Sequence, residues 1–262
     1  MTETGGRQDR RILFALWLLM FAASSQVMVI APLLSSIGQA LGVSMASLGH
    51  LMTVYAATVG VFALVAGPIS DRVGRRRVLL WGSVLMTFAL ALHGVAGSYL
   101  SLLAFRTLAG VAGGILSGAI VAFVGDYFPG DRRGWANGWV MTGLAAGQIL
   151  GVPAGTLLAE LSGYRAPFVA LAGVSTLAAL AVFVLVPHVP TASGRLTLGS
   201  VLRGYRSLLN RRSTFAATAT YVAVFFGIAT FMLFLPTWLE AELGFTASRI
   251  AVLYLIGGVG TV

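Results

Sequence analysis

Residues 67–77 read Gly67-Pro68-Ile69-Ser70-Asp71-Arg72-Val73-Gly74-Arg75-Arg76-Arg77, a short basic stretch between two long apolar runs. The runs are Leu48–Ile69 and Val78–Ala96, and each is close to the roughly 20 residues that a helix needs to cross about 30 Å of hydrocarbon. Because so few polar residues join them, two spanning helices must form a tight hairpin with both ends at one membrane face. Short loops rich in arginine stay in the cytoplasm, so this face is predicted to be the cytoplasmic one. Gly67 and Gly74 are expected to permit close backbone approach and a sharp turn.

The composition is that of an integral membrane protein. Of the 262 residues, 58% are hydrophobic and 10% are charged, whereas an ordinary soluble domain carries about 25% charged residues. The mean hydropathy is +0.91, so the chain cannot cover a water-facing surface. We assign the net charge of +9 to cytoplasmic loops that face anionic lipid headgroups, and not to binding of nucleic acid.

Apolar runs predict six membrane spans, a polar segment over residues 187–212, and two further runs. The expected spans are Ile12–Leu34, Leu48–Ile69, Val78–Ala96, Leu100–Gly125, Trp135–Leu161, Ala166–Val186 and Thr214–Leu239, with an eighth run that begins near Ile250. Pro32 is expected to end or kink the first span, and the uncharged residues 35–47 to form an outer loop. Residues 198–209 are expected to form a short amphipathic helix on the inner leaflet.

The arginines are distributed unevenly about these spans. Of the seventeen basic residues, all but Arg106, Arg165 and Arg249 fall in segments assigned to the cytoplasm. Such an asymmetry predicts a multi-pass protein of the plasma membrane (the inner membrane of a Gram-negative cell) with a cytoplasmic amino terminus.

The order of Gly67, Asp71-Arg72 and Gly74-Arg75-Arg76 resembles the signature loop of the major facilitator superfamily, which joins the second and third helices. A generic basic loop with turn glycines is the alternative. The resemblance implies an all-α polytopic membrane helix bundle of the major facilitator fold. It also implies that Asp71 and the arginines latch one conformation by ion pairing, in a relay with an acid that ends the fourth helix. Asp126 matches that acid.

Two distant stretches repeat one pattern, which bears on the domain organisation. Pro32 is followed by Leu41-Gly42-Val43-Ser44, and Pro236 by Leu243-Gly244-Phe245-Thr246. The echo favours two six-helix halves related by a parallel repeat, although chance similarity between outer loops is the alternative. We therefore expect an N-terminal six-helix half-bundle over 1–187, a cytoplasmic central loop over 188–212, and the start of a C-terminal half over 213–262.

The end of the sequence is informative on this hypothesis. Val262 comes only about thirteen residues after Ile250, too few for a spanning helix. We expect the chain to be truncated after the start of the eighth helix, so that a complete transporter requires a missing C-terminal half. The alternative is a short protein whose last helix stops inside the membrane, which would leave backbone carbonyls unpaired in lipid.

Arg106 is the strongly charged residue that lies well within a span, and such residues are functional candidates because burying them is costly. Arg106 with Gly110 resembles the fourth-helix signature of the drug/proton antiporters, in which the arginine is implicated in proton coupling. The usual glutamine between them is Ala109 here. An arginine that snorkels to the outer headgroups is the alternative.

The fifth span carries glycines at a spacing that resembles the antiporter motif of exporters in this superfamily. The residues are Gly138, Gly147, Gly151, Pro153 and Gly155. Where the motif has Gly-Pro, this chain has Gly-Val-Pro, which resembles the arabinose- and sugar-efflux branch of the drug/proton antiporters, a group that includes multidrug-efflux permeases. Tight packing of small residues without a functional role is the alternative.

Polar residues in the spans are candidates for lining a central cavity, although polar packing between helices explains them equally well. They are Gln26, Tyr55 and Gln148. We find no phosphate-binding glycine loop, no metal-ligand cluster and no Ser/His/Asp set, and therefore expect no catalytic residue, no metal, no cofactor and no enzymatic activity.

The sequence predicts a secondary active transporter that works by alternating access. Its partners would be protons, the lipid bilayer and a small drug-like molecule, sugar or metabolite that it exports. An uptake symporter or uniporter of the same fold, or a non-transporting membrane fragment, are the alternatives.

Overall fold

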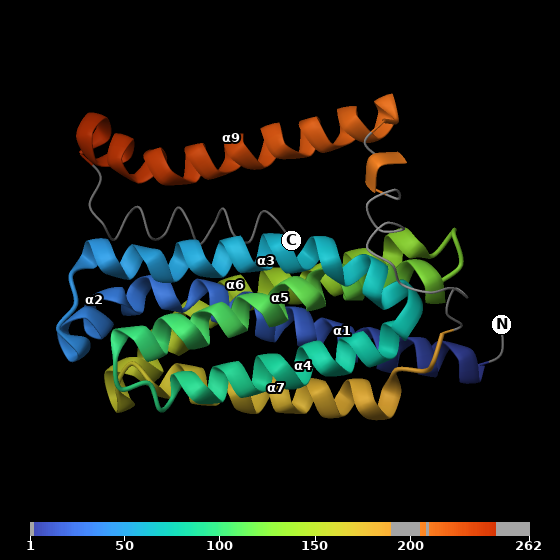
Figure 1. The fold of residues 1–262 in the computed structure, drawn as a ribbon, viewed down its shortest axis with the longest axis horizontal. Helices are drawn as coiled ribbons and strands as arrows, with labels where there is room; N and C mark the ends of the chain where they lie inside the picture. Colours follow the sequence, from blue (N-terminus) through green and yellow to red (C-terminus); the bar gives the residue numbers. More distant parts are fainter. Residues whose placement is uncertain (1–2, 190–204, 208–209, 245–262) are drawn as a thin grey trace. The chain divides into compact units, whose positions relative to one another are not determined.

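The computed structural model describes residues 3–189, 205–207 and 210–244, and these fall in two units, Met1–Gly194 and Arg195–Val262. Each unit is described by itself. The first contains α1 (Glu3–Met28), α2 (Ile30–Leu41), α3 (Met45–Val73), α4 (Arg75–His93), α5 (Tyr99–Tyr127), α6 (Arg133–Ser162) and α7 (Ala166–Leu185), and the second contains α9 (Arg212–Leu243) (Figure 1). Within the described residues every regular element is a helix, which confirms the predicted all-α class.

Five segments of the described chain are long and apolar enough to cross a membrane. They are Gly6–Leu34, Ala46–Val73, Tyr99–Tyr127, Arg133–Ser162 and Ala166–Leu185. Helix α4 is not among them because arginines fill its first turn. The surface helix expected over 198–209 lies outside the described residues apart from the helical residues 205–207, and so does the apolar run from Ile250.

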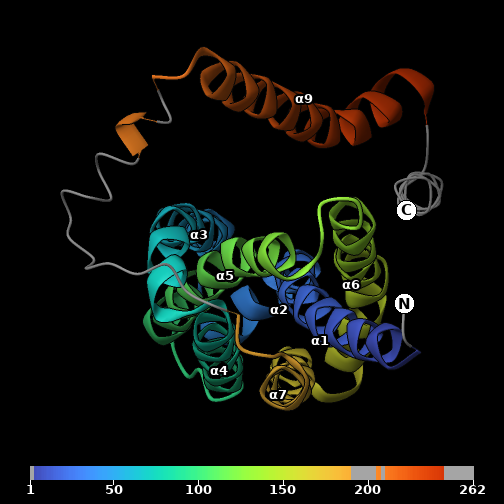
Figure 2. The same ribbon diagram turned by 90° about the vertical axis from the view of Figure 1, so that its right-hand side faces the viewer.

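The helices of the first unit pack in a pattern that relates its two halves. The most extensive pairs are α3 with α5 and α1 with α6, followed by α4 with α5, α4 with α7 and α1 with α7. Viewed from one end, α5 lies beside α3 and α4, and α1 lies beside α6 and α7 (Figure 2). If α1, α3 and α4 exchange places with α5, α6 and α7, respectively, each of these five helix pairs becomes another pair of the same set or remains itself. Such equivalence is the mark of a nested three-helix repeat.

The link between α3 and α4 is much shorter than the sequence predicted. Residues 67–73 are helical, and only Gly74, with φ of 106°, separates the two helices. Pro68 removes one backbone donor but does not end α3. The close approach expected at Gly67 is not seen among the described residues, where a Cβ built there meets nothing within 4 Å.

We expect Gly74→Ala to destabilise the first unit by roughly 1–3 kcal/mol, the cost of holding a non-glycine residue in this backbone conformation. The thermal unfolding midpoint in detergent measures the effect. Gly67→Ala is the matched control, because the same methyl group there enters open space inside a helix and should leave the midpoint unchanged or higher. Equal midpoints for the two variants would contradict the prediction.

The first span also differs from its prediction. Pro32 does not end it, because α2 runs on through residues 35–41 and the expected outer loop shrinks to residues 42–44. The helix is instead interrupted at Val29, whose dihedral angles remain helical (φ −65°, ψ −24°). Pro32 cannot donate to the carbonyl of Met28, and this missing bond falls at the interruption.

The proposed internal repeat has a counterpart in backbone geometry. Helix α2 ends at Gly42, with φ of 65°, and α9 ends at Gly244, with φ of 61°. A glycine in the left-handed conformation is a common helix terminator because it has no Cβ to strain. The two Leu-Gly pairs therefore end their helices in the same way.

Candidate functional site

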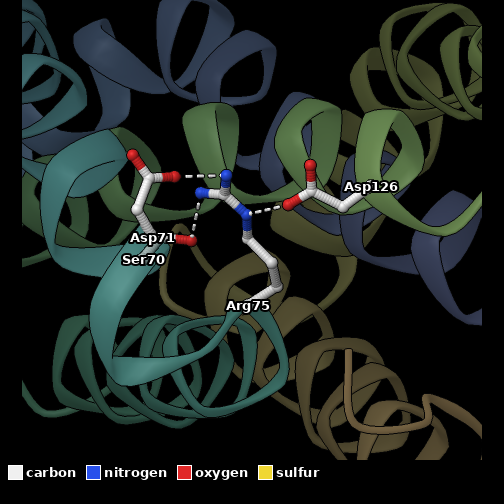
Figure 3. Close-up of polar contacts among 4 residues, drawn as sticks. All are labelled: Ser70, Asp71, Arg75 and Asp126. Atoms are coloured by element: carbon white, nitrogen blue, oxygen red, sulfur yellow. Dashed lines mark hydrogen bonds and ion pairs between the residues drawn. The ribbon is translucent and has the colours of Figure 1, made fainter. Parts of the chain in front are cut away.

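An ion-pair cluster joins three helices at the arginine-rich end of the first unit (Figure 3). Arg75, the first residue of α4, forms an ion pair with Asp71 in the last turn of α3. Its Nε donates to Asp126 Oδ2 near the end of α5 at 2.7 Å, and its Nη1 donates to Ser70 Oγ at 2.9 Å. One guanidinium thus binds two carboxylates and a hydroxyl, as the resemblance implied for Asp71 and Asp126.

This cluster joins the ends of three helices but contributes little to the stability of the fold. The side chains of Asp71 and Asp126 are 50% and 44% exposed, whereas that of Arg75 is 13% exposed. Ion pairs with such exposed members are screened and contribute at most about 1 kcal/mol each. Contacts of this strength can break and re-form during a conformational cycle.

Two other predicted members of this loop, Arg76 and Gly67, do not join the cluster among the described residues. Arg76 is directed to α7, where its Nη2 donates to the Phe183 carbonyl at 2.6 Å. Arg72 lines a cavity together with Arg76, and Gly67 contributes no contact to the cluster. Ser70 was missed by the sequence analysis, although its place beside Asp71 is the signal that could have found it.

A second tie at this end was also missed. Arg132 Nη1 donates to Asp9 Oδ2 at 2.8 Å, so the loop between α5 and α6 is bound to the start of α1. Asp9 is an isolated acid among the arginines of the amino-terminal segment, which is a weak signal by itself. Together with the pair of Arg75 and Asp126 at the end of α5, this tie brings the starts of α1, α4 and α6 to one end of the bundle.

Arg106 lies in the interior of the bundle, where it joins α5 to α1 and α3. Its side chain is 0% exposed. Its Nη1 donates to Gln26 Oε1 at 2.8 Å, and Gln26 Nε2 donates to the Tyr55 hydroxyl at 2.7 Å. The guanidinium carbon also lies 4.5 Å from the centre of the Tyr55 ring, a geometry that stabilises a cation by its attraction to the aromatic face. Gln26 and Tyr55 are therefore brought together, as candidates for one site.

The alternative in which Arg106 snorkels to the headgroups is wrong, because the side chain is enclosed by helices. Within the described residues it has no carboxylate partner, and its Nε and Nη2 are buried without a hydrogen-bond acceptor. A buried cation in this state is costly. Two N–H groups in a fixed fork remain able to bind an acceptor oxygen.

The glycines of α6 form a seam against α1. A Cβ on Gly147 would lie 2.6 Å from the Phe21 carbonyl oxygen, one on Gly151 would lie 2.9 Å from Ser25 Cα, and one on Gly155 would overlap Val29. The two helices approach this closely because these positions have no side chain. Hydrogen bonds from Trp17 to Thr142 and from Ser24 to the Leu144 carbonyl cross the same interface.

Two residues of the predicted antiporter motif lie away from this seam. Gly138 has nothing within 4 Å of its Cβ position, and Pro153 is exposed. Gly143, which the motif comparison did not include, does belong to the seam, since a Cβ there would lie 2.5 Å from the Trp17 carbonyl oxygen. Gly143 lies four residues before Gly147 and therefore on the same face of the helix, and this spacing could have identified it from the sequence.

Comparison with known proteins decides the family. The profile of the Major Facilitator Superfamily matches residues 16–262. The chain belongs to the major facilitator superfamily. It is accordingly a multi-pass membrane protein, as predicted.

Relatives of this superfamily chain include three bacterial proteins named as transporters or resistance proteins. The "Uncharacterized MFS-type transporter YceJ" of Bacillus subtilis (strain 168) is 31% identical over 94% of this chain and 63% of its own length. "Multidrug resistance protein MdtG" of Serratia proteamaculans (strain 568) is 33% identical over 63% of this chain and 41% of its length. "Probable sugar efflux transporter" of Helicobacter pylori (strain J99) is 30% identical over 64% and 43%. The chain spans about half the length of these curated relatives.

Among solved structures, the peptide transporter POT in complex with sulfate superimposes with a TM-score of 0.64. The match covers 93% of this chain and 49% of that one, at 21% sequence identity. This likeness concerns the fold of the superfamily and carries no information about substrate.

Two further polar residues of this superfamily chain, one of them predicted, do not join either site. Gln148 is exposed on α6 and does not contact the cluster of Arg106, Gln26 and Tyr55. His93 is buried, with its Nδ1 2.6 Å from the Ala89 carbonyl oxygen and its ring stacked on Phe168, a packing role. Within the described residues no group of three or more His, Cys, Asp or Glu could hold a metal ion.

Proposed function

We propose that the protein, at the length that its relatives have, exports a small drug-like molecule, sugar or metabolite in exchange for protons by alternating access. The amino terminus and the arginine-rich end would face the cytoplasm of a cell whose plasma membrane holds the protein. Arg106, with its two unsatisfied N–H groups, would take part in proton coupling, and the cluster of Asp71, Arg75 and Asp126 would latch one conformation.

The observation that carries the export direction is the seam of Gly147, Gly151 and Gly155 against α1. These glycines have the spacing of the antiporter motif, and their close backbone contact gives two helices a smooth surface along which to rock. The names of the relatives, MdtG multidrug resistance proteins and sugar efflux transporters, support the same direction. Gln26 and Tyr55, which hold Arg106, are the residues that we propose to line the path.

Inverted membrane vesicles test the proposal. Vesicles with the protein at the length of its relatives would be energised by respiration while a pH-sensitive dye reports the proton gradient. Addition of a cationic dye, a neutral antibiotic or a pentose should partly dissipate the gradient for the transported solute, and a protonophore should abolish the effect. The 262-residue chain would be measured in parallel. Accumulation of the solute by intact energised cells would instead indicate uptake, and no flux at either length would contradict transport.

Replacing Asp71 with asparagine should slow the transport cycle while leaving substrate affinity and folding nearly unchanged. The substitution removes one carboxylate from Arg75 and costs at most about 1 kcal/mol of stability, because the pair is half exposed. Turnover and substrate affinity would be measured separately in proteoliposomes. Asp131→Asn is the matched control, since Asp131 is an exposed acid at the same end that does not contact Arg75. Wild-type turnover in Asp71→Asn would remove the latch role.

A further inference from the structure

A cationic cavity opens at the arginine-rich end, where α4 begins and α7 ends. Its volume is about 370 Å³, within the roughly 300–1,000 Å³ of small-molecule sites. Three arginines line it (Arg72, Arg76 and Arg77), together with His188, Val73 and Val189. Its lining contains no acidic side chain, so the cavity favours an anion.

Two of the arginines of this cavity, Arg76 and Arg77, are not consumed by the neighbouring ion pairs. Arg75, which lies between Arg72 and Arg76 in sequence, is occupied by Asp71 and Asp126. Among the described residues, neither Arg76 nor Arg77 has a carboxylate within ion-pair distance. The cavity therefore presents positive charge that an external anion can neutralise.

Arg76 is held in place by α7 with part of its hydrogen-bonding capacity unused. Its Nη2 donates to the Phe183 carbonyl oxygen at 2.6 Å, and its Nη1 lies 3.3 Å from His188 Nε2. The guanidinium carbon is 5.5 Å from the centre of the Phe183 ring. Its Nε is buried and has no hydrogen-bond partner among the described residues. A side chain fixed in this way loses little entropy when it binds an anion.

An exposed apolar stripe extends from the same cavity along α4. Arg77, Trp81, Val84 and Phe88 follow one another at helical spacing on one face, and the last three are 60%, 59% and 57% exposed. On the adjacent helix α7, Phe183 is 61% exposed beneath Arg76. The arginines at the helix ends therefore suit an anionic headgroup, and the stripe suits an apolar chain attached to that headgroup.

We propose that this cavity binds the phosphate of an anionic phospholipid such as phosphatidylglycerol, with the acyl chains lying along the stripe of α4 and beside Phe183. Basic cavities between membrane helices bind such headgroups, and each arginine near the surface contributes about fivefold in affinity. Inorganic phosphate shares the headgroup chemistry, but it would leave the stripe of Trp81, Val84 and Phe88 without a role in binding. The proposal does not depend on the direction or substrate of transport.

Native mass spectrometry of the 262-residue chain in detergent tests it. The chain would be titrated with phosphatidylglycerol, with phosphatidylcholine of the same chain length, and with inorganic phosphate as competitor. We expect binding of phosphatidylglycerol in preference to phosphatidylcholine, and no displacement by phosphate at equal concentration. Arg76→Gln and Arg77→Gln should each raise the dissociation constant for phosphatidylglycerol by about fivefold.

Arg10→Gln is the matched control, because Arg10 is exposed in the first turns of α1 and lies outside this cavity. It should leave the dissociation constant unchanged, and a loss equal to that of Arg77→Gln would mean diffuse attraction and overturn the proposal. Arg76→Gln also removes the bond to Phe183, so Arg77→Gln, which gives up only a 3.4 Å contact to the Val73 carbonyl, decides the result if the former misfolds. Equal binding of the two lipids, or displacement by phosphate, would also overturn it.

Discussion

Replacing Arg106 with methionine is expected to lower transport by about 10- to 100-fold while the helical bundle remains folded. The substitution removes the charged hydrogen bond to Gln26 and the contact with the Tyr55 ring. Hydrogen bonds of charged groups contribute about 1.5–3 kcal/mol, and about 1.4 kcal/mol corresponds to a factor of ten. Stability should not fall in parallel, because Arg106 is a buried cation without a carboxylate partner among the described residues, and a neutral side chain of similar length avoids that desolvation cost.

Transport in the inverted-vesicle assay and the unfolding midpoint in detergent would both be measured for this variant. Arg106→Lys keeps the charge but loses the planar fork, so it should retain part of the activity. Thr107→Val is the matched control on α5, since the Thr107 hydroxyl donates only to the Leu103 carbonyl of its own helix. Wild-type efflux in Arg106→Met, or equal losses in activity and stability, would contradict a role for the charge in transport.

Replacing Gly114 with alanine is expected to destabilise the first unit by about 1–3 kcal/mol or more, the usual cost of overpacking. The added Cβ would lie 2.6 Å from the Val59 carbonyl oxygen and 2.9 Å from the Ala63 nitrogen. Both are backbone atoms of α3 and cannot rotate away, so α3 and α5 must separate along their most extensive interface. The thermal midpoint followed by tryptophan fluorescence measures the loss.

Gly118, one turn further along α5, provides the control for this variant. A Cβ at Gly118 lies 3.6 Å from the Ala63 carbonyl oxygen, which is ordinary contact. Gly118→Ala should therefore raise the midpoint slightly, since alanine favours a helix by about 1 kcal/mol over glycine. If both variants melt at the same temperature, the close packing of α3 on α5 at Gly114 is not a determinant of stability.

The sequence was sufficient to predict five of the seven spans as long apolar helices, because a run of about twenty apolar residues has few structural alternatives. It misjudged the ends of helices, where hydropathy is uninformative. The polar residues 70–72 looked like part of a loop but continue α3, which ends at Val73, since a helix end exposed to water tolerates polar side chains. Pro32 was expected to end or kink the first span, whereas the helix is interrupted at Val29 and continues through Leu41.

Side-chain direction explains most of what the sequence could not supply about the site. Successive helical residues are rotated by about 100°, so Arg75 reaches Asp126 on α5, Arg76 reaches Phe183 on α7, and Arg77 is exposed. A count of charges treats the three as equivalent. Likewise the sequence shows that Arg106 lies within a span, but its environment depends on Gln26 and Tyr55, which belong to other helices.

The one-residue link at Gly74 has a mechanical consequence. A longer loop would absorb the tilt of one helix before its neighbour responded, whereas a single glycine bridged by the Arg75–Asp71 ion pair couples the two helices for as long as that pair is formed. A tilt of α3 would then also move α4. It would move α7 as well, through the hydrogen bond from Arg76 to the Phe183 carbonyl. Spectroscopic probes on α3 and α7 would consequently report the same rate constant.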